Sequence, residues 1–381
     1  MSQLASLISS LQDLLSGLTT EQQSSIELLI KEGELHQQAT WAGHMTPTID
    51  SPALLGQILS SLHNGNLLSA DLYPKLAFIE SQLINLFCQL FRQRTGHFTH
   101  GSSYANLEAL WQAREHGNDN ANIVYSSAAA HYSIAKACRI LGLEFQVIET
   151  DEQGKMQIQA LRSACEQNHP VAIVATAGTS SCGAIDPLAE CISIARNVDS
   201  WCHIDAAWGG SLAFLDDYDD LSPAKYADSV CFDPHKALGQ PKPCSILLYQ
   251  HALEPFTDLD IDYLSQIPKK TLIGSYGGEL FLPLWCSLFF NKEQLTEQLN
   301  WRLQQAELFA IMLKQHSNWT VWHSPTGIVC FKPMEDIDLS NLEKAGVFSR
   351  SKINHHSVYR AVFASHTTQA EKLFTELAPY L

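Results

Sequence analysis

A lysine lies shortly after an apolar run near the middle of the chain. The run Ser229–Phe232 stops at an Asp-Pro pair, and His235 and Lys236 come next. An amine held in a dry site has a depressed pKa and can attack a carbonyl carbon to form a Schiff base. This chemistry points to an aldehyde cofactor, pyridoxal 5'-phosphate (PLP), with Lys236 as the residue that binds it.

A second apolar run, Trp201–Ile204, ends at a carboxylate. Because Asp205 closes this run, its charge is expected to be shielded from water and to need a cationic or hydrogen-bonding partner. The protonated nitrogen of a PLP ring is one such partner; backbone amides or an arginine are the alternative. Lys236 follows 31 residues later, a spacing that lets both side chains reach one ligand from nearby strand ends.

Two loops that lead into predicted helices carry further polar candidates. Gly101 permits close backbone approach, and the hydroxyls of Ser102 and Ser103 beside a helix N-terminus suit a phosphate. A simple helix cap is the alternative there. His131 stands at the next such loop, where an imidazole could stack on a flat ring or shuttle protons; a locally bonded helix-start residue is the alternative.

The chain alternates between strand-like and helix-like segments from about residue 95. The predicted strands are short and apolar: Asn122–Ser126, Phe145–Ile148, Val171–Ala175, Trp201–Asp205, Ser229–Phe232 and Ser245–Tyr249. The predicted helices between them are Leu107–Glu115, Ser133–Leu141, Gln157–Gln167 and Pro187–Val198. This alternation predicts a mainly parallel sheet covered on both faces, with a ligand beyond the carboxyl ends of its strands.

Three regions are predicted. They are an N-terminal helical segment (1–45), a large cofactor-binding domain (46–278) and a small C-terminal α+β domain (279–381) that begins with a long helix, Leu282–Leu313. In the first region leucines recur at helical spacing, and Thr20 with Gln23 is expected to form a capping box. Its apolar stripe must be buried, either against a partner subunit or against its own domain.

The composition argues against several classes of protein. The 381 residues include 40 acidic and 24 basic side chains, with no Lys/Arg block, so neither nucleic acid nor an anionic membrane is an expected partner. No apolar run reaches a membrane-spanning length and no cationic leader opens the chain, which indicates a cytoplasmic protein. The ten cysteines form no Cys-x-x-Cys pair, so buried reduced thiols are expected rather than disulfides or a metal site.

Six motifs stand in the order seen in group II PLP-dependent amino-acid decarboxylases, at residues 98–103, 130–133, 175–180, 183–187, 203–207 and 233–236. The chain resembles this family over roughly residues 40 to 380. The resemblance implies an α/β protein of PLP fold type I (aspartate aminotransferase-like), with a mainly parallel central sheet and a homodimer with active sites at its interface. Residues 239–244 and 261–265 look most like the short bacterial histidine decarboxylase branch.

The resemblance also implies catalytic roles. Lys236 would be the Schiff-base lysine, and Asp205 would pair with the pyridine nitrogen. His131 would stack on the ring and assist reprotonation of the substrate carbon. Tyr263 would contribute from a loop that runs to Gly278 and resembles the family's mobile active-site loop.

Cofactor contacts follow from the same resemblance. Ser102, Ser103 and His235 would bind the phosphate of PLP. Thr176 and Ala207 would line the edge and the face of its ring. Each of these residues stands in one of the six motifs.

Two residues bear on the substrate. Arg360 matches a C-terminal arginine that in the family lies near the substrate carboxylate, although an ion pair at a strand edge is equally compatible with the sequence. Tyr276 stands in Gly274-Ser275-Tyr276 where related chains usually carry Gly-Ser-Arg. The lost charge puts in doubt any carboxylate or phosphate contact from this loop.

The expected reaction is decarboxylation of an L-amino acid through an external aldimine, with release of carbon dioxide and the amine. Asp205 would keep the ring protonated, so that the ring can take up the charge left on the α-carbon. Another fold type I enzyme, a carbon–carbon or carbon–sulfur lyase or an aminotransferase, is the first alternative. A non-catalytic PLP-binding protein is the second.

Overall fold

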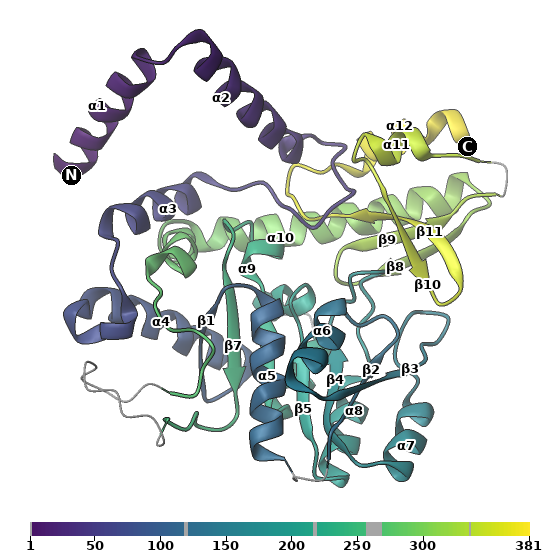
Figure 1. Ribbon diagram of the computed structural model, residues 1–381. Coiled ribbons are helices and arrows are strands. Elements are labelled where there is room, and N and C mark those ends of the chain that lie inside the picture. The colour runs from purple at the N-terminus through teal and green to yellow at the C-terminus, as the bar shows by residue number, and fades with distance from the viewer. Residues whose placement is uncertain (1, 118–120, 216–218, 257–268, 335–336) are drawn as a thin grey trace.

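Two sheets organise the computed structural model of the protein, which describes residues 2–117, 121–215, 219–256, 269–334 and 337–381 (Figure 1). The larger sheet has seven strands in the order β1-β7-β6-β5-β4-β2-β3, and the smaller has four in the order β10-β11-β9-β8. The strands of the larger sheet are β1 (Thr95–Thr99), β2 (Ile123–Ser127), β3 (Glu144–Ile148), β4 (Pro170–Thr176), β5 (Trp201–Asp205), β6 (Ser229–Phe232) and β7 (Ser245–Tyr249). The strands of the smaller sheet are β8 (Thr320–Ser324), β9 (Ile328–Lys332), β10 (Ser349–Ile353) and β11 (His356–Val362).

Helices connect the strands and cover the larger sheet. Those before the sheet are α1 (Ser2–Ser16), α2 (Thr20–Gly33), α3 (Ser51–His63) and α4 (Pro74–Phe91). Those that lie between its strands along the chain are α5 (Ser102–His116), α6 (Tyr132–Leu141), α7 (Ile158–Gln167), α8 (Leu188–Asn197) and the short α9 (Pro234–Ala237). The C-terminal part holds α10 (Leu282–His316), α11 (Ser340–Lys344) and α12 (Ala370–Leu377).

The expected mainly parallel sheet is confirmed. Strands β3, β2, β4, β5 and β6 pair in parallel, whereas β7 pairs antiparallel with both β6 and β1. Every residue of the central strands β4, β5 and β6 is buried, because helices cover both faces of a parallel sheet. The carboxyl ends of these three strands therefore meet at one edge of the sheet.

The long helix α10 joins the two sheets. Leu284, Leu295 and Leu299 in its first half belong to the hydrophobic cluster of the larger sheet. Phe309 and Leu313 in its second half belong to the cluster of the smaller sheet. The domain boundary at residue 279 stays a prediction, because this helix packs into both cores.

The first two helices extend away from the rest of the chain as an arm (Figure 1). Leu14, Leu28 and Leu29 on this arm are 63%, 65% and 69% exposed. The predicted capping box lies one residue too late, since Thr19 and not Thr20 caps α2 and exchanges hydrogen bonds with Gln22. The helical pattern was correct, but its apolar side has no partner within the described part of this chain.

The prediction of buried reduced thiols is confirmed, because all ten cysteines are free and buried. Burial raises the pKa of several of them, for example that of Cys88 to about 11. Among the described helices, none combines the length and the apolar character needed to cross a membrane.

The crossing of α3 and α10 depends on a glycine. A Cβ at Gly56 would collide with the carbonyl oxygen of Leu282 and the Cα of Pro283. We expect Gly56→Ala to lower the free energy of unfolding by about 1–3 kcal/mol, because backbone must shift to admit the methyl group. Urea unfolding followed by circular dichroism measures this change.

Gly33→Ala is the matched control for Gly56→Ala. Gly33 lies in helical backbone with nothing within 4 Å of an added Cβ, so this substitution should leave stability unchanged or slightly higher. Equal unfolding midpoints for the two variants would contradict the close packing of α3 on α10.

Candidate active site

The carboxyl ends of β4, β5 and β6 bring the predicted cofactor residues together. Thr176 at the end of β4 is in register with Asp205 at the end of β5, and Asp205 is in register with Cys231 of β6. Lys236 lies just beyond β6, on the short helix α9. This is the edge of a parallel sheet where ligands bind, as the alternation of strands and helices predicts.

Asp205 is buried and faces only hydrogen-bond donors. Its Oδ2 accepts a hydrogen bond from Asn106 Nδ2 at 3.0 Å, and its Oδ1 accepts from the backbone N–H of Ala207 at 3.1 Å. The single hydrogen of the Cys231 thiol is shared between Oδ1 of Asp205, at 3.5 Å, and Oδ1 of Asn106, at 3.3 Å. No lysine or arginine of the described residues forms an ion pair with it. Three donors stabilise the ionised carboxylate, which keeps free lone pairs for one more donor.

Lys236 forms an ion pair with Asp233 and not with Asp205. Its Nζ lies 3.1 Å from Asp233 Oδ2. Burial alone would lower the pKa of Lys236, but the carboxylates of Asp233 and Asp205 outweigh it, so the pKa lies above its ordinary value. The expectation of a depressed pKa is therefore wrong for the protein without cofactor, because the charges of Asp233 and Asp205 together outweigh the effect of burial.

Two predicted phosphate ligands also contact Asp233. Ser102 Oγ donates a hydrogen bond to Asp233 Oδ2 at 2.7 Å, and His235 Nε2 lies 3.6 Å from the same oxygen. His235 Nδ1 lies 2.6 Å from the carbonyl oxygen of Cys244. Burial lowers the pKa of His235, although the charge of Asp233 opposes this. Asp233 thus organises the loop after β6, a role that was not predicted from the sequence.

The N-terminus of α5 is open to an anion. Gly101 precedes the helix with φ of 111°, gives no side-chain cap, and has nothing within 4 Å of an added Cβ. The N–H groups of Tyr104 and Ala105 turn back to the Gly101 carbonyl, which leaves those of Ser102 and Ser103 without a partner in the helix. Such a helix end, with two N–H groups free of helical partners, fits the phosphate of PLP.

A buried polar atom also lies without a partner at this edge of the sheet. Thr176 is 4% exposed, and its Oγ1 meets no hydrogen-bond partner among the described residues. Ala207 follows Asp205 and is nearly as buried, at 6%. An unsatisfied hydroxyl beside a small residue fits the edge of a flat ring whose nitrogen reaches Asp205. Together with the open end of α5, the residues present fit PLP.

His131 caps helix α6, as expected of a locally bonded residue at a helix start. Its Nδ1 lies 2.7 Å from Ser133 Oγ and accepts a hydrogen bond from the Ser133 N–H at 3.3 Å. Burial lowers the pKa of His131, and the charge of Asp205 opposes this while that of Lys236 adds to it. The cap and the predicted role at the ring are compatible, because the cap uses only one of the two ring nitrogens.

Arg360 lies on β11 without a carboxylate partner among the described residues. Its guanidinium donates hydrogen bonds to the carbonyl oxygens of Ser180 and Gly43 and to Ser349 Oγ. Burial lowers its pKa. No strand-edge ion pair of Arg360 is therefore seen among the described residues, and its contact with a substrate carboxylate stays a prediction.

Tyr276 is not brought to the Lys236 cluster. Its hydroxyl donates to Glu80 Oε2 at 3.2 Å, and both residues line a pocket of about 410 Å³ with His97. None of the predicted cofactor residues lines this pocket. Tyr263 lies outside the described residues, so its predicted contribution stays a prediction.

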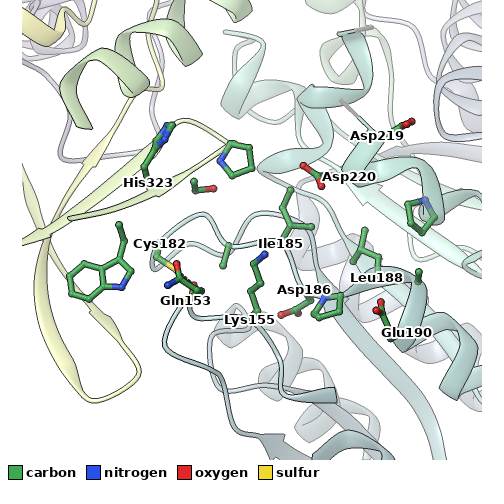
Figure 2. A pocket seen from close by; sticks show the side chains of 17 residues that line it. Gln153, Lys155, Cys182, Ile185, Asp186, Leu188, Glu190, Asp219, Asp220 and His323 are labelled. Carbon is green, nitrogen blue, oxygen red and sulfur yellow. Dashed lines mark hydrogen bonds between the residues drawn. The ribbon is translucent and has the colours of Figure 1, made fainter. Parts of the chain in front are cut away.

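A larger pocket of about 510 Å³ lies where the smaller sheet meets the large domain, and it is not the predicted site. Figure 2 shows His323 of β8 on one side and Lys155 and Asp186 on the other. Asp186 contacts one of the predicted cofactor residues. Its carboxylate accepts hydrogen bonds from the backbone N–H of Thr176 and from that of Met156, each at 2.8 Å. Burial raises the pKa of Asp186 to about 6, against the effect of these two hydrogen bonds.

The strand order, with Asp205 at the end of β5 and Lys236 just beyond the neighbouring strand β6, places the chain in the class of fold type I PLP-dependent proteins. The sequence profile described as "Pyridoxal-dependent decarboxylase conserved domain" matches residues 23–334. The chain therefore belongs to this family, which confirms the resemblance seen in the sequence.

Named relatives and solved structures agree with this assignment. L-2,4-diaminobutyrate decarboxylase of Rhizobium meliloti is 37% identical over 219 residues, which is 54% of this chain and 44% of that protein. Histidine decarboxylase of Morganella morganii is 29% identical over 67% of this chain and 70% of its own length. The structure of a sphingosine-1-phosphate lyase from Burkholderia pseudomallei superposes with a TM-score of 0.80 at 20% identity, covering 95% of this chain and 90% of that one. The last likeness shows the fold alone.

Asp233 controls when the Lys236 amine becomes neutral. We expect Asp233→Asn to lower the pKa of Lys236, because an opposite charge is removed while burial remains. The neutral amine is then present at lower pH, so cofactor-free protein should take up PLP at lower pH than the wild type. The rate of uptake against pH, followed by absorbance, measures the shift.

Asp338→Asn is the control for this titration, because Asp338 is exposed and its partners among the described residues are Ser340 and Arg350. Its uptake profile should overlay that of the wild type. An Asp233→Asn profile that stays in place, or moves to higher pH, would show that Asp233 does not set the charge of Lys236.

Proposed function

We propose that the protein is a PLP-dependent decarboxylase of an L-amino acid. The observation that carries the proposal is the pair of buried carboxylates at adjacent strand ends. Asp233 holds Lys236, whereas Asp205 faces only donors and keeps its lone pairs for a ring nitrogen. Membership of the pyridoxal-dependent decarboxylase family supports the reaction type.

Bound PLP supplies an electron-accepting ring that stabilises negative charge on the α-carbon of an amino acid. The residues of the chain bind and orient. The open end of α5 would anchor the phosphate, Asp205 would accept the ring N–H, and Lys236 would bind the cofactor aldehyde. The substrate carboxylate leaves as carbon dioxide, and a proton replaces it on the α-carbon. His131, Tyr263 and Lys236 are the proposed donors of that proton.

The substrate approaches, in this proposal, through a hollow of about 470 Å³ beside His131. Ser180, whose carbonyl oxygen accepts a hydrogen bond from Arg360, lines it, as do the charged side chains of Glu149 and Lys352. We infer that Arg360 orients the α-carboxylate and that the mixed charges favour a polar amino acid. Relatives named for diaminobutyrate and histidine are in keeping with such a substrate.

A panel of L-amino acids tests the reaction. The protein loaded with PLP should release carbon dioxide and the corresponding amine from at least one polar amino acid, and Lys236→Ala should release neither. Gas release and mass spectrometry of the products measure both. Release of an aldehyde, a keto acid or a thiol without carbon dioxide would favour a different reaction on the same fold, such as that of the lyase with the similar structure.

We also propose a homodimer, with the arm of α1 and α2 packed on the partner subunit. The exposed leucines of the arm support this, because an apolar helix face of this kind needs a protein partner. Ten free thiols are in keeping with a reducing compartment, and we propose the cytoplasm.

Light scattering tests the dimer. The wild type should have twice the mass of one chain at micromolar concentration. Replacing Leu28 and Leu29 together by Gln should weaken the association, because the two side chains supply apolar area to the interface. Ser25→Gln on the same helix is the control and should stay dimeric. A monomeric wild type would refute the proposal.

A further inference from the structure

A buried chain of hydrogen bonds runs from Asp205 away from the cofactor site. Asn106 Nδ2 donates to Asp205 at 3.0 Å, and Asn106 Oδ1 lies 2.9 Å from His203 Nε2. His203 Nδ1 lies 2.8 Å from Ser229 Oγ, which accepts a hydrogen bond from Trp201 Nε1 at 2.9 Å. Asn106, His203 and Ser229 are fully buried. None of these three was predicted as a site residue.

The direction of every bond in this chain is determined by its two ends. A carboxylate accepts only, so Asn106 must turn its NH₂ group toward Asp205 and its oxygen toward His203. His203 then carries its proton on Nε2 and accepts at Nδ1 from the Ser229 hydroxyl. The indole N–H of Trp201 can only donate, and Ser229 Oγ is free to accept it. Burial lowers the pKa of His203 to about 4, in keeping with a neutral ring.

A branch of the chain reaches His131. The second N–H of Asn106 donates to Ser133 Oγ at 2.9 Å, so the Ser133 hydroxyl donates in turn to His131 Nδ1 at 2.7 Å. The backbone N–H of Ser133 points at the same nitrogen at 3.3 Å and can only donate. Both donors require an unprotonated Nδ1, so the proton of a neutral His131 lies on Nε2. That nitrogen meets no hydrogen-bond partner among the described residues.

We propose that Asn106 is a positioning residue that orients the Asp205 carboxylate and, through Ser133, holds the proton of His131 on Nε2. His203, Ser229 and Trp201 keep the amide of Asn106 in the one orientation that serves both residues. One buried amide thereby prepares the acceptor for the ring nitrogen and the N–H donor at the ring face. The proposal rests on the assignment of PLP to this site and not on the reaction that follows.

The tautomers can be read in the protein without cofactor. Long-range ¹H–¹⁵N correlation spectra of ¹⁵N-histidine protein should show His131 and His203 both protonated at Nε2. Loss of the matching signals in His131→Gln and His203→Gln assigns them. A proton on Nδ1 of either ring would overturn the proposal.

A matched pair at His203 tests the effect on the cofactor. His203→Gln keeps an N–H donor near the Asn106 oxygen, whereas His203→Leu leaves that oxygen only the weak donor of the Cys231 thiol, at 3.3 Å, and the amide less firmly held. The Leu variant should bind PLP about tenfold more weakly than the Gln variant, and Asn106→Asp at least as weakly, in a fluorescence titration. Circular dichroism checks that the variants fold.

Equal affinity of the Gln and Leu variants for PLP would overturn the proposal. If the Leu variant does not fold, the wild-type tautomers alone decide. Both readouts are made without substrate, so they stand or fall independently of decarboxylation.

Discussion

The buried carboxylate of Asp205 is the constraint on which the site depends. A charge at the end of a fully buried strand is costly unless donors surround it. The protein supplies three: the Asn106 amide, the Ala207 backbone N–H and the Cys231 thiol. Helix α5, strand β6 and the turn after β5 must therefore all lie close to Asp205. The arrangement stabilises a negative charge without supplying a cation.

A second carboxylate, that of Asp233, explains why Lys236 does not form an ion pair with Asp205. Lys236 forms an ion pair with Asp233, which also accepts a hydrogen bond from the Ser102 hydroxyl at the start of α5. Asp205 also acts on the charge of Lys236, but the ion pair in the structure is with Asp233. Two carboxylates on neighbouring strand ends thus hold the lysine ready while they leave one acceptor for the ring of the cofactor.

Short-range pattern was enough to predict the frame of the site. The bounds of β5, β6 and β7 match the predicted strands, because each is an apolar run that ends at a turn or a polar residue. Strand β1, Thr95–Thr99, is absent from the predicted strands, since four of its five residues are polar or glycine. Residues that meet only in the folded chain were also missed: Asn106 lies 99 positions from Asp205 and 97 from His203.

The charge of Lys236 shows the limit of local reasoning. Burial alone predicts a lowered pKa, but a neighbouring anion three positions away reverses the sign. Tyr276 is another such case, because its hydrogen bond to Glu80 joins residues 196 positions apart. The roles of individual residues toward the substrate remain predictions for the same reason: they depend on contacts beyond the pattern of one segment.

The most direct test of the central claim is to reduce the PLP-loaded protein with borohydride and map the labelled peptide by mass spectrometry. The structure predicts a single stable adduct, on the peptide that contains Lys236, and its loss in Lys236→Ala. An adduct on another lysine, such as Lys242 or Lys270, or an unchanged adduct in Lys236→Ala, would contradict the site described above.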